Sequence, residues 1–139
     1  MARNGVISVG FGDFTRAVDK FEKHLIREIK RVVAETAEML VSQAKALAPV
    51  DDGNLKSSID VTYAQGGLTA IVRVGAFYAI YLEVGTGIYS TEGNGRKDPW
   101  VYYKNGRYYF TRGIRPQPFW NPSVEVAMKH FRDEMNKLG

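Results

Sequence analysis

The sequence contains no cysteine, which excludes disulfide bonds and thiolate metal sites. No apolar run approaches the roughly 20 residues that a membrane-spanning helix needs, and the first ten residues, MARNGVISVG, lack the apolar block of a signal peptide. The motifs HExxH, GxSxG and CxxC are also absent. From these absences we expect a protein that has no membrane segment and folds in a cytoplasm.

The composition is that of an ordinary globular protein, with 139 residues of which 45% are hydrophobic and 24% charged. That length fits one domain over residues 1–139 with a core of its own. The net charge of +4 is unevenly spread, because residues 86–115 alone carry six Lys and Arg against two acids. A local basic segment favours an acidic partner more strongly than a diffuse surplus does.

A long amphipathic helix is predicted from residue 14 to about residue 47. Asp13 is its expected N-cap, and Pro49 ends it. Such a helix is ~50 Å long, whereas a compact domain of this size has a radius of gyration of only ~14 Å. Either the helix breaks or a neighbouring subunit covers part of its apolar stripe, and we expect the second. The stripe recurs every three or four residues and comprises Phe14, Val18, Phe21, Leu25, Ile29, Val32, Thr36 and Met39.

Short strands and a second helix complete the fold. Residues 59–63 and 68–74 alternate in polarity around a Gly-Gly turn, which predicts a β-hairpin, and Val6–Val9 is a further short strand. Asn121 is the predicted N-cap of the final helix, with Pro122 at its first position. The order of elements predicts an α+β fold: a long N-terminal helix packed on a small antiparallel sheet of hairpins, with a C-terminal helix.

A second hairpin is centred on Asn105-Gly106 in WVYYKNGRYYF, the dipeptide favoured in type I′ turns. Its register pairs Lys104 with Arg107 and Tyr102 with Tyr109, and it places these four side chains on one face. Opposed like charges are unfavourable, so this face is expected to be open to water or a partner. Two partners fit it: nucleic acid, through base stacking and phosphate contacts, and protein, through aromatic and arginine hot spots. The interaction loop comprises Arg96, Lys97, Trp100, Tyr102, Lys104, Arg107, Tyr109 and Arg112.

The stretch YAIYLEVGTG, residues 78–87, holds the acid whose catalytic role has to be weighed, Glu83. General acid–base catalysis needs a titratable partner, a nucleophile or a metal, and both histidines are expected on solvated helix faces. A phosphate loop needs a longer run than Gly85-Thr86-Gly87 offers. A structural interpretation is therefore favoured: the glycines allow a sharp exit, and Glu83 accepts hydrogen bonds from backbone or from an arginine such as Arg115. The stretch fits the period of a helix and of a strand equally.

Three motifs, APVDDGNLKSSI, YAIYLEVGTG and RPQPFWNPS, follow the N-terminal helix in this order. Together they resemble the small tail-completion, or head–tail joining, proteins of tailed bacteriophages and prophages. Asp52, Val84 and Ser123 stand where those proteins typically have threonine, phenylalanine and alanine. The resemblance covers most of residues 14–139, and the hairpin Trp100–Phe110 falls in the most variable stretch of that family.

The resemblance implies a structural protein without enzymatic activity or cofactor, assembled in the bacterial cytoplasm into a virion ring that is expected to be hexameric. It implies three kinds of partner: further copies of itself, the tail-tube or tail-terminator protein, and the head connector, with DNA contact in the channel and none with a membrane. Residues 86–115 are expected to form a loop that is flexible or ordered by partners. Tyr78, Ala79, Tyr81, Leu82 and Val84 are expected to anchor their segment to the core. The motif residues are Pro49, Asp51, Gly53, Leu55, Tyr78, Tyr81, Glu83, Gly85, Thr86, Gly87, Pro118, Phe119 and Pro122.

Overall fold

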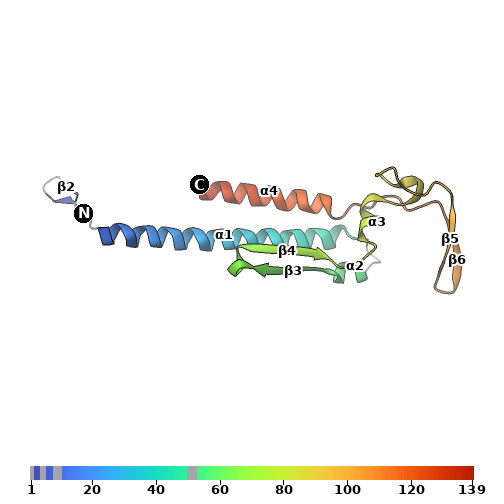
Figure 1. Ribbon diagram of the computed structural model, residues 1–139, viewed down its shortest axis with the longest axis horizontal. Helices are drawn as coiled ribbons and strands as arrows, with labels where there is room; N and C mark the ends of the chain where they lie inside the picture. The colour runs from blue at the N-terminus through green and yellow to red at the C-terminus, as the bar shows by residue number, and fades with distance from the viewer. Residues whose placement is uncertain (1, 4–5, 8–10, 50–52) are drawn as a thin grey trace.

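The computed structural model describes residues 2–3, 6–7, 11–49 and 53–139, and the expected α+β class is confirmed. The molecule is elongated, with a long N-terminal helix at its centre and a hairpin projecting at the far end (Figure 1). The hairpins form separate two-stranded antiparallel sheets among the described residues. No helix in this part of the chain has the length and apolar character needed to cross a membrane.

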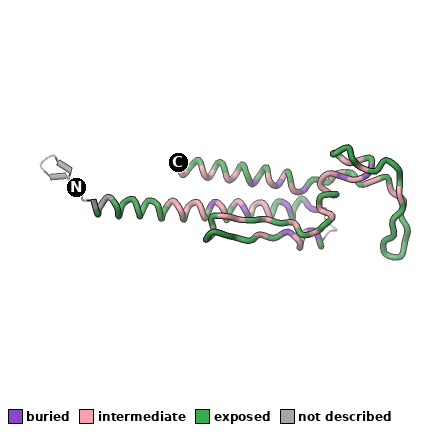
Figure 2. The backbone as a smooth tube through the Cα atoms, in the orientation of Figure 1, coloured by how far each residue is buried: buried purple, intermediate pink, exposed green. Residues whose placement is uncertain are grey.

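The first helix, α1, runs unbroken over Phe11–Leu47 and ends just before Pro49, as predicted. It begins two residues before Asp13, so the predicted N-cap is wrong and Asp13 lies inside the first turn. The N-terminal part of α1 extends beyond the end of the last helix of the chain, and its described residues up to His24 are exposed (Figures 1 and 2). Phe21 lies there with 66% of its surface in water. The helix therefore overhangs its own domain, as its length predicts.

The last helix, α4 (Asn121–Leu138), lies alongside the C-terminal half of α1. Its N-cap position is Trp120, so the prediction of Asn121 as N-cap is wrong by one residue, and Pro122 lies in the first turn as expected. Ala127 is buried on the face toward α1. Most of the other apolar side chains of α4 are half-buried, although Met128 is exposed.

The first hairpin confirms its predicted strands. Strands β3 (Ile59–Ala64) and β4 (Thr69–Val74) pair antiparallel, with Ile59 opposite Val74 and Val61 opposite Val72. The hairpin packs on α1, on the side away from α4 in the view of Figure 1. The N-terminal strands β1 (Ala2–Arg3) and β2 (Val6–Ile7) also pair, which confirms the described part of the predicted strand Val6–Val9.

The core lies at the end of α1 that is near the hairpin β3–β4. Leu55, on the short helix α2 (Gly53–Ser57), and Phe119 are fully buried there. They pack against Ala44 of α1 and against Ala48, which directly follows α1. Burying a large apolar side chain contributes about 1.5–3 kcal/mol, so these residues hold α1, α2 and the segment before α4 together. Asp51 and Asp52 lie outside the described residues.

The segment with equal helix and strand character is a helix, α3 (Ala79–Val84). Tyr78, Ala79 and Leu82 pack against the core as expected, and Val84 is half-buried. Tyr81 does not: about half of its surface is exposed, so its predicted core role is wrong. On a helix of six residues, one side faces outward, and Tyr81 lies on that side.

Candidate interaction surface

The carboxylate of Glu83 caps helix α4. The backbone N–H groups of Phe119 and Trp120 donate to its Oε1 at 3.0 and 2.8 Å, and the N–H of Asn121 donates to its Oε2 at 3.0 Å. The first N–H groups of a helix have no partner inside the helix, and a negative charge there is favoured by the helix dipole. Because α4 has no side-chain cap of its own, Glu83 supplies it from α3.

The predicted hydrogen bonding of Glu83 to backbone is thus confirmed, whereas the alternative partner Arg115 is wrong. The guanidinium of Arg115 instead lies 4.7 Å from the ring centroid of Tyr89, in a cation–π arrangement. The three donors give the position of the half-buried Glu83 carboxylate a complete structural explanation. An acid engaged in this way connects α3 to α4 and does not need a catalytic role to account for it.

After α3 the chain turns sharply at Gly85-Thr86-Gly87, as predicted. Gly85 has φ of 79° and Gly87 has φ of 60°, a region that side chains other than glycine rarely adopt. A β-carbon on Gly85 would lie 2.9 Å from the carbonyl oxygen of Ile114, and one on Gly87 would collide with the carbonyl of Arg112. The N–H of Thr86 donates to Ile114 O at 2.9 Å, and the N–H of Ile114 returns a bond to Thr86 Oγ1 at 2.8 Å. The two glycines thus allow two backbone segments to touch, and this contact forms the root of the projecting hairpin.

The projecting hairpin has the register that its sequence predicts. Strands β5 (Trp100–Lys104) and β6 (Arg107–Thr111) pair with Lys104 opposite Arg107. The turn residues Asn105 and Gly106 have φ of 52° and 79°, as a type I′ turn requires. The hairpin lies at the end of the molecule opposite the N-terminus and points away from the helices (Figure 1).

One face of this hairpin is basic and aromatic, as predicted. The rings of Tyr102 and Tyr109 stack with centroids 5.4 Å apart and planes at 20°, and Lys104 and Arg107 lie beyond them toward the turn. At its base the guanidinium of Arg96 lies 5.5 Å from the centre of the Trp100 ring. The two tyrosines, Lys104 and Arg107 are called the basic face below.

The opposite face is apolar, and the sequence analysis overlooked it. Val101, Tyr103, Tyr108 and Phe110 alternate with the residues of the basic face, and each is between 59% and 77% exposed. The rings of Tyr103 and Tyr108 meet edge to face, 5.1 Å apart. These four residues, called the apolar face below, include no charge. The alternation that located the basic face also locates this one, so the signal was present in the sequence.

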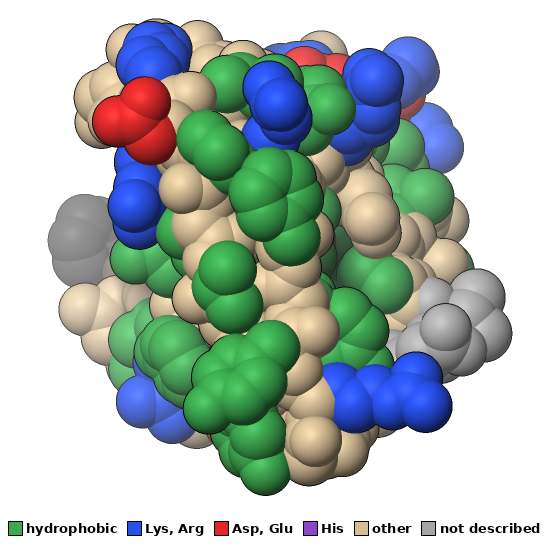
Figure 3. Space-filling model, turned by 90° about the vertical axis from the view of Figure 1, so that its right-hand side faces the viewer, with side chains coloured by type: hydrophobic (Ala, Val, Ile, Leu, Met, Phe, Trp, Pro, Cys, Tyr) green, Lys and Arg blue, Asp and Glu red, His purple; other side chains and the backbone are tan. Residues whose placement is uncertain are grey.

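Further apolar side chains are exposed on and near α3. Phe77 is 87% exposed, and Ile80, Ile88 and Ile114 are also exposed. In Figure 3, which views this end of the molecule, hydrophobic side chains run down the middle and Lys and Arg side chains lie near the top and bottom. An exposed apolar patch with a polar border is typical of surfaces that bind proteins, membranes or ligands.

An open hollow of about 430 Å³ lies between α3 and the root of the hairpin. Tyr81 and Trp100 line it, together with Glu92 and Arg96. Tyr81 therefore lines this hollow instead of packing in the core. The remaining predicted loop residues, Lys97 and Arg112, are exposed near the hairpin root.

The other motif residues lie in the body of the molecule, which consists of α1, α2, the hairpin β3–β4, α3 and α4. Pro49 follows α1, Gly53 opens α2, and Pro118 precedes the buried Phe119. The hydroxyl of Tyr78 accepts a bond from Asn54 Nδ2 at 3.2 Å, which joins α2 to the start of α3. The motifs APVDDGNLKSSI, YAIYLEVGTG and RPQPFWNPS therefore all contribute residues to one core. The interaction loop extends from that core.

An uncharged aromatic face that is exposed to water is typical of surfaces that contact other proteins. The comparison of the sequence with known families agrees. Residues 12–85 match the family described as "Bacteriophage HK97-gp10, putative tail-component". The match covers more than half of the chain, so the chain belongs to this family of bacteriophage tail components.

This family membership gives the protein a structural role in the phage particle and makes it part of the virion. The matched residues include α1, the hairpin β3–β4 and α3, and they stop at Gly85, before the projecting hairpin. No curated protein and no solved structure matches the chain.

Proposed function

We propose that this chain is a tail-completion protein, which forms a ring at the neck of the phage and joins the tail to the head. The observation that carries the proposal is the apolar face of β5–β6: four large apolar side chains, without a charge among them, on a hairpin that projects from a phage tail component. Protein interfaces concentrate aromatic residues and exclude charges at their centres. This face therefore suits a protein partner better than it suits water.

The elongated shape supports a ring. A ring that closes by rotation uses heterologous contacts, in which two different surfaces of each subunit meet. The overhang of α1, with Phe21, lies at one end of the molecule, and the apolar face of the hairpin lies at the other (Figure 1). Neighbouring copies, the tail-tube or tail-terminator protein and the head connector are the proposed partners, with six copies in the virion.

The projecting segment 86–115 is proposed to become ordered against these partners. A single two-stranded hairpin is at best marginally stable in water. Its root is fixed by the contacts of Gly85 and Gly87, but the ten residues Val101–Phe110 are all exposed. A partner that covers the apolar face removes this surface from water and so stabilises the hairpin.

Complementation of the phage that encodes this protein tests the proposal. Without the gene, we expect filled heads and separate tails in electron micrographs, and the wild-type gene should restore joined particles. The double variant Tyr103→Ser/Tyr108→Ser should fail to restore them although it folds. Val126→Ser, which changes an exposed apolar residue on α4, is the matched control and should restore joining. Normal joining of heads and tails in the absence of the gene would contradict the proposal.

A further inference from the structure

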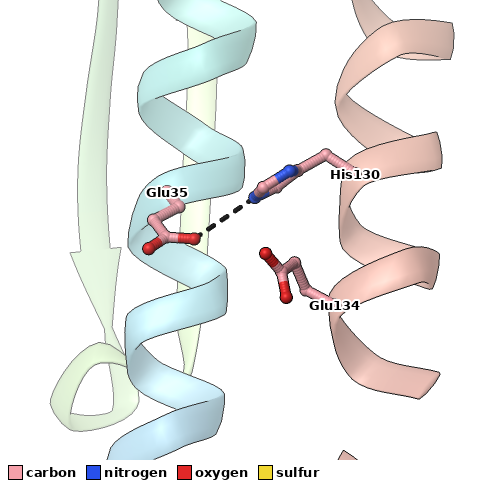
Figure 4. Close-up of side chains that lie close together, drawn as sticks. All are labelled: Glu35, His130 and Glu134. Atoms are coloured by element: carbon pink, nitrogen blue, oxygen red, sulfur yellow. Dashed lines mark hydrogen bonds and ion pairs between the residues drawn. The ribbon is translucent and has the colours of Figure 1, made fainter. Parts of the chain in front are cut away.

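Three potential metal ligands meet between the two long helices, away from the interaction surface. Glu35 lies on α1, and His130 and Glu134 lie on α4 and point toward it (Figure 4). One ligand atom of each residue lies within 4.8 Å of the other two. His130 was expected on a solvated face, but its side chain is only 23% exposed, because α1 covers it.

The distance between His130 and Glu35 fits two ligands of one ion. His130 Nε2 and Glu35 Oε2 are 3.3 Å apart, whereas a charge-assisted N–H···O bond is typically about 2.7–2.9 Å long. Two ligands bound at about 2.1 Å to a tetrahedral zinc ion are separated by about 3.4 Å. A ligand atom of Glu134 lies within 4.8 Å of a ligand atom of both His130 and Glu35.

The spacing of the ligands also suits a metal. His130 and Glu134 are four residues apart on α4, the spacing at which one helix face presents two ligands to an ion. Glu35 approaches from the neighbouring helix, so an ion bound here would link α1 to α4.

Two basic side chains, Arg31 and Lys137, lie beside the proposed ligands without blocking them. Arg31 Nη1 donates to Glu35 Oε1 at 2.8 Å, on the other oxygen from the one that faces His130. This hydrogen bond is the main cause that lowers the pKa of Glu35, and it orients the carboxylate. Lys137 lies 3.3 Å from Glu134 Oε2, but its own side chain is mostly in water and can move away.

We propose that Glu35, His130 and Glu134 bind one divalent transition-metal ion, for which Zn²⁺ is the natural occupant. Imidazole suits Zn²⁺ and its first-row neighbours, whereas Mg²⁺ and Ca²⁺ prefer oxygen alone. Three protein ligands leave a fourth position for water. The ion stabilises the packing of α4 on α1, and this effect is independent of the proposed role at the phage neck.

The test is a thermal unfolding series of the full chain, without an affinity tag, in increasing Zn²⁺. At free Zn²⁺ about 100-fold above the dissociation constant, the midpoint should rise by about 10 °C. Calorimetry should give one ion per chain, and Mg²⁺ should produce no shift. Co²⁺ should produce the visible absorption of a low-coordinate site with a nitrogen ligand.

Variants connect this response to the three residues. The chain has two histidines, so His130→Ala should abolish the Zn²⁺ shift and the Co²⁺ spectrum, while His24→Ala, a change on an exposed part of α1, should keep both. Glu134→Gln preserves side-chain shape and should weaken binding at least tenfold while leaving the metal-free circular dichroism spectrum unchanged. A wild-type midpoint that does not move with Zn²⁺, or a shift that persists in His130→Ala, would overturn the site.

Discussion

The body of the molecule buries large apolar side chains, whereas the projecting hairpin exposes them to water. In the body, Leu55 and Phe119 are fully buried and α1 is covered by α4 on one side and by β3–β4 on another. In the hairpin, every residue from Val101 to Phe110 is exposed, although most of them are aromatic or aliphatic. The body is stabilised by its own packing, whereas the hairpin leaves its apolar surface in water, where the proposed partner would cover it.

The junction between the two regions shows how they are kept distinct. Glu83 fixes α3 to the start of α4 on the body side, and Gly85 and Gly87 allow the chain to leave in a tight corner. Rigid attachment at the root with an exposed arm is the arrangement expected of a binding element on a stable scaffold. Substitutions in the two regions should therefore have different consequences, and these can be ranked by their effect on the free energy of unfolding.

The largest effect is expected for Leu55→Ala in the core of the body. Removing a fully buried leucine side chain leaves a cavity, and we expect a loss of about 3 kcal/mol in the free energy of unfolding. Urea denaturation followed by circular dichroism measures it. Leu47→Ala, at a half-exposed position in the last turn of α1, is the control and should cost less than about 1 kcal/mol. Equal losses in both variants would contradict a core centred on α2.

A smaller loss is expected for Glu83→Gln at the junction. The amide keeps the shape of the side chain but removes the charge and one acceptor oxygen from the three N–H donors. We expect a cost of about 1–2 kcal/mol, with faster hydrogen exchange at the start of α4. Glu92→Gln, an exposed acid in the loop, should change neither quantity. An unchanged stability of Glu83→Gln would show that α4 does not depend on this cap.

The smallest effect on stability is expected for Lys104→Gln/Arg107→Gln on the basic face. These two charges lie opposite each other across the hairpin, so removing them should change the free energy of unfolding by less than about 0.5 kcal/mol. If the basic face contacts DNA in the channel, the slope of log affinity against log salt should fall by about two. Lys20→Gln/Lys23→Gln on the exposed part of α1 makes the same change in net charge and should leave the slope unaltered.

Local sequence patterns predicted the elements whose causes are themselves local. The register of β5–β6 follows from Asn105-Gly106, because a two-residue turn leaves only one pairing. The long helix α1 follows from its period and from Pro49. The alternation of side chains along β5 and β6 also predicts the apolar face, on the side opposite to Lys104 and Arg107.

Contacts between distant residues account for what the sequence did not predict. Asn121 looked like an N-cap because it precedes Pro122, but the cap is provided by Glu83, 38 residues earlier in the chain. The stretch 79–84 fits either period, and packing of Leu82 against the core accompanies its helical form. His130 looked solvated because its neighbours are charged, yet α1 covers it. Each of these outcomes depends on which element packs beside which, and a single sequence does not contain that information in its local pattern.

The most direct test of the account is the solution mass of the wild type and of Tyr103→Ser/Tyr108→Ser, measured by light scattering over a wide range of concentration. We expect the wild type to pass from monomer to a ring-sized species as concentration rises, because the apolar face binds a neighbouring copy. The double variant should remain a monomer with an unchanged circular dichroism spectrum and unfolding midpoint. A wild type that stays monomeric at every concentration, or a variant that assembles equally well, would contradict the assignment of the apolar face as the contact between subunits.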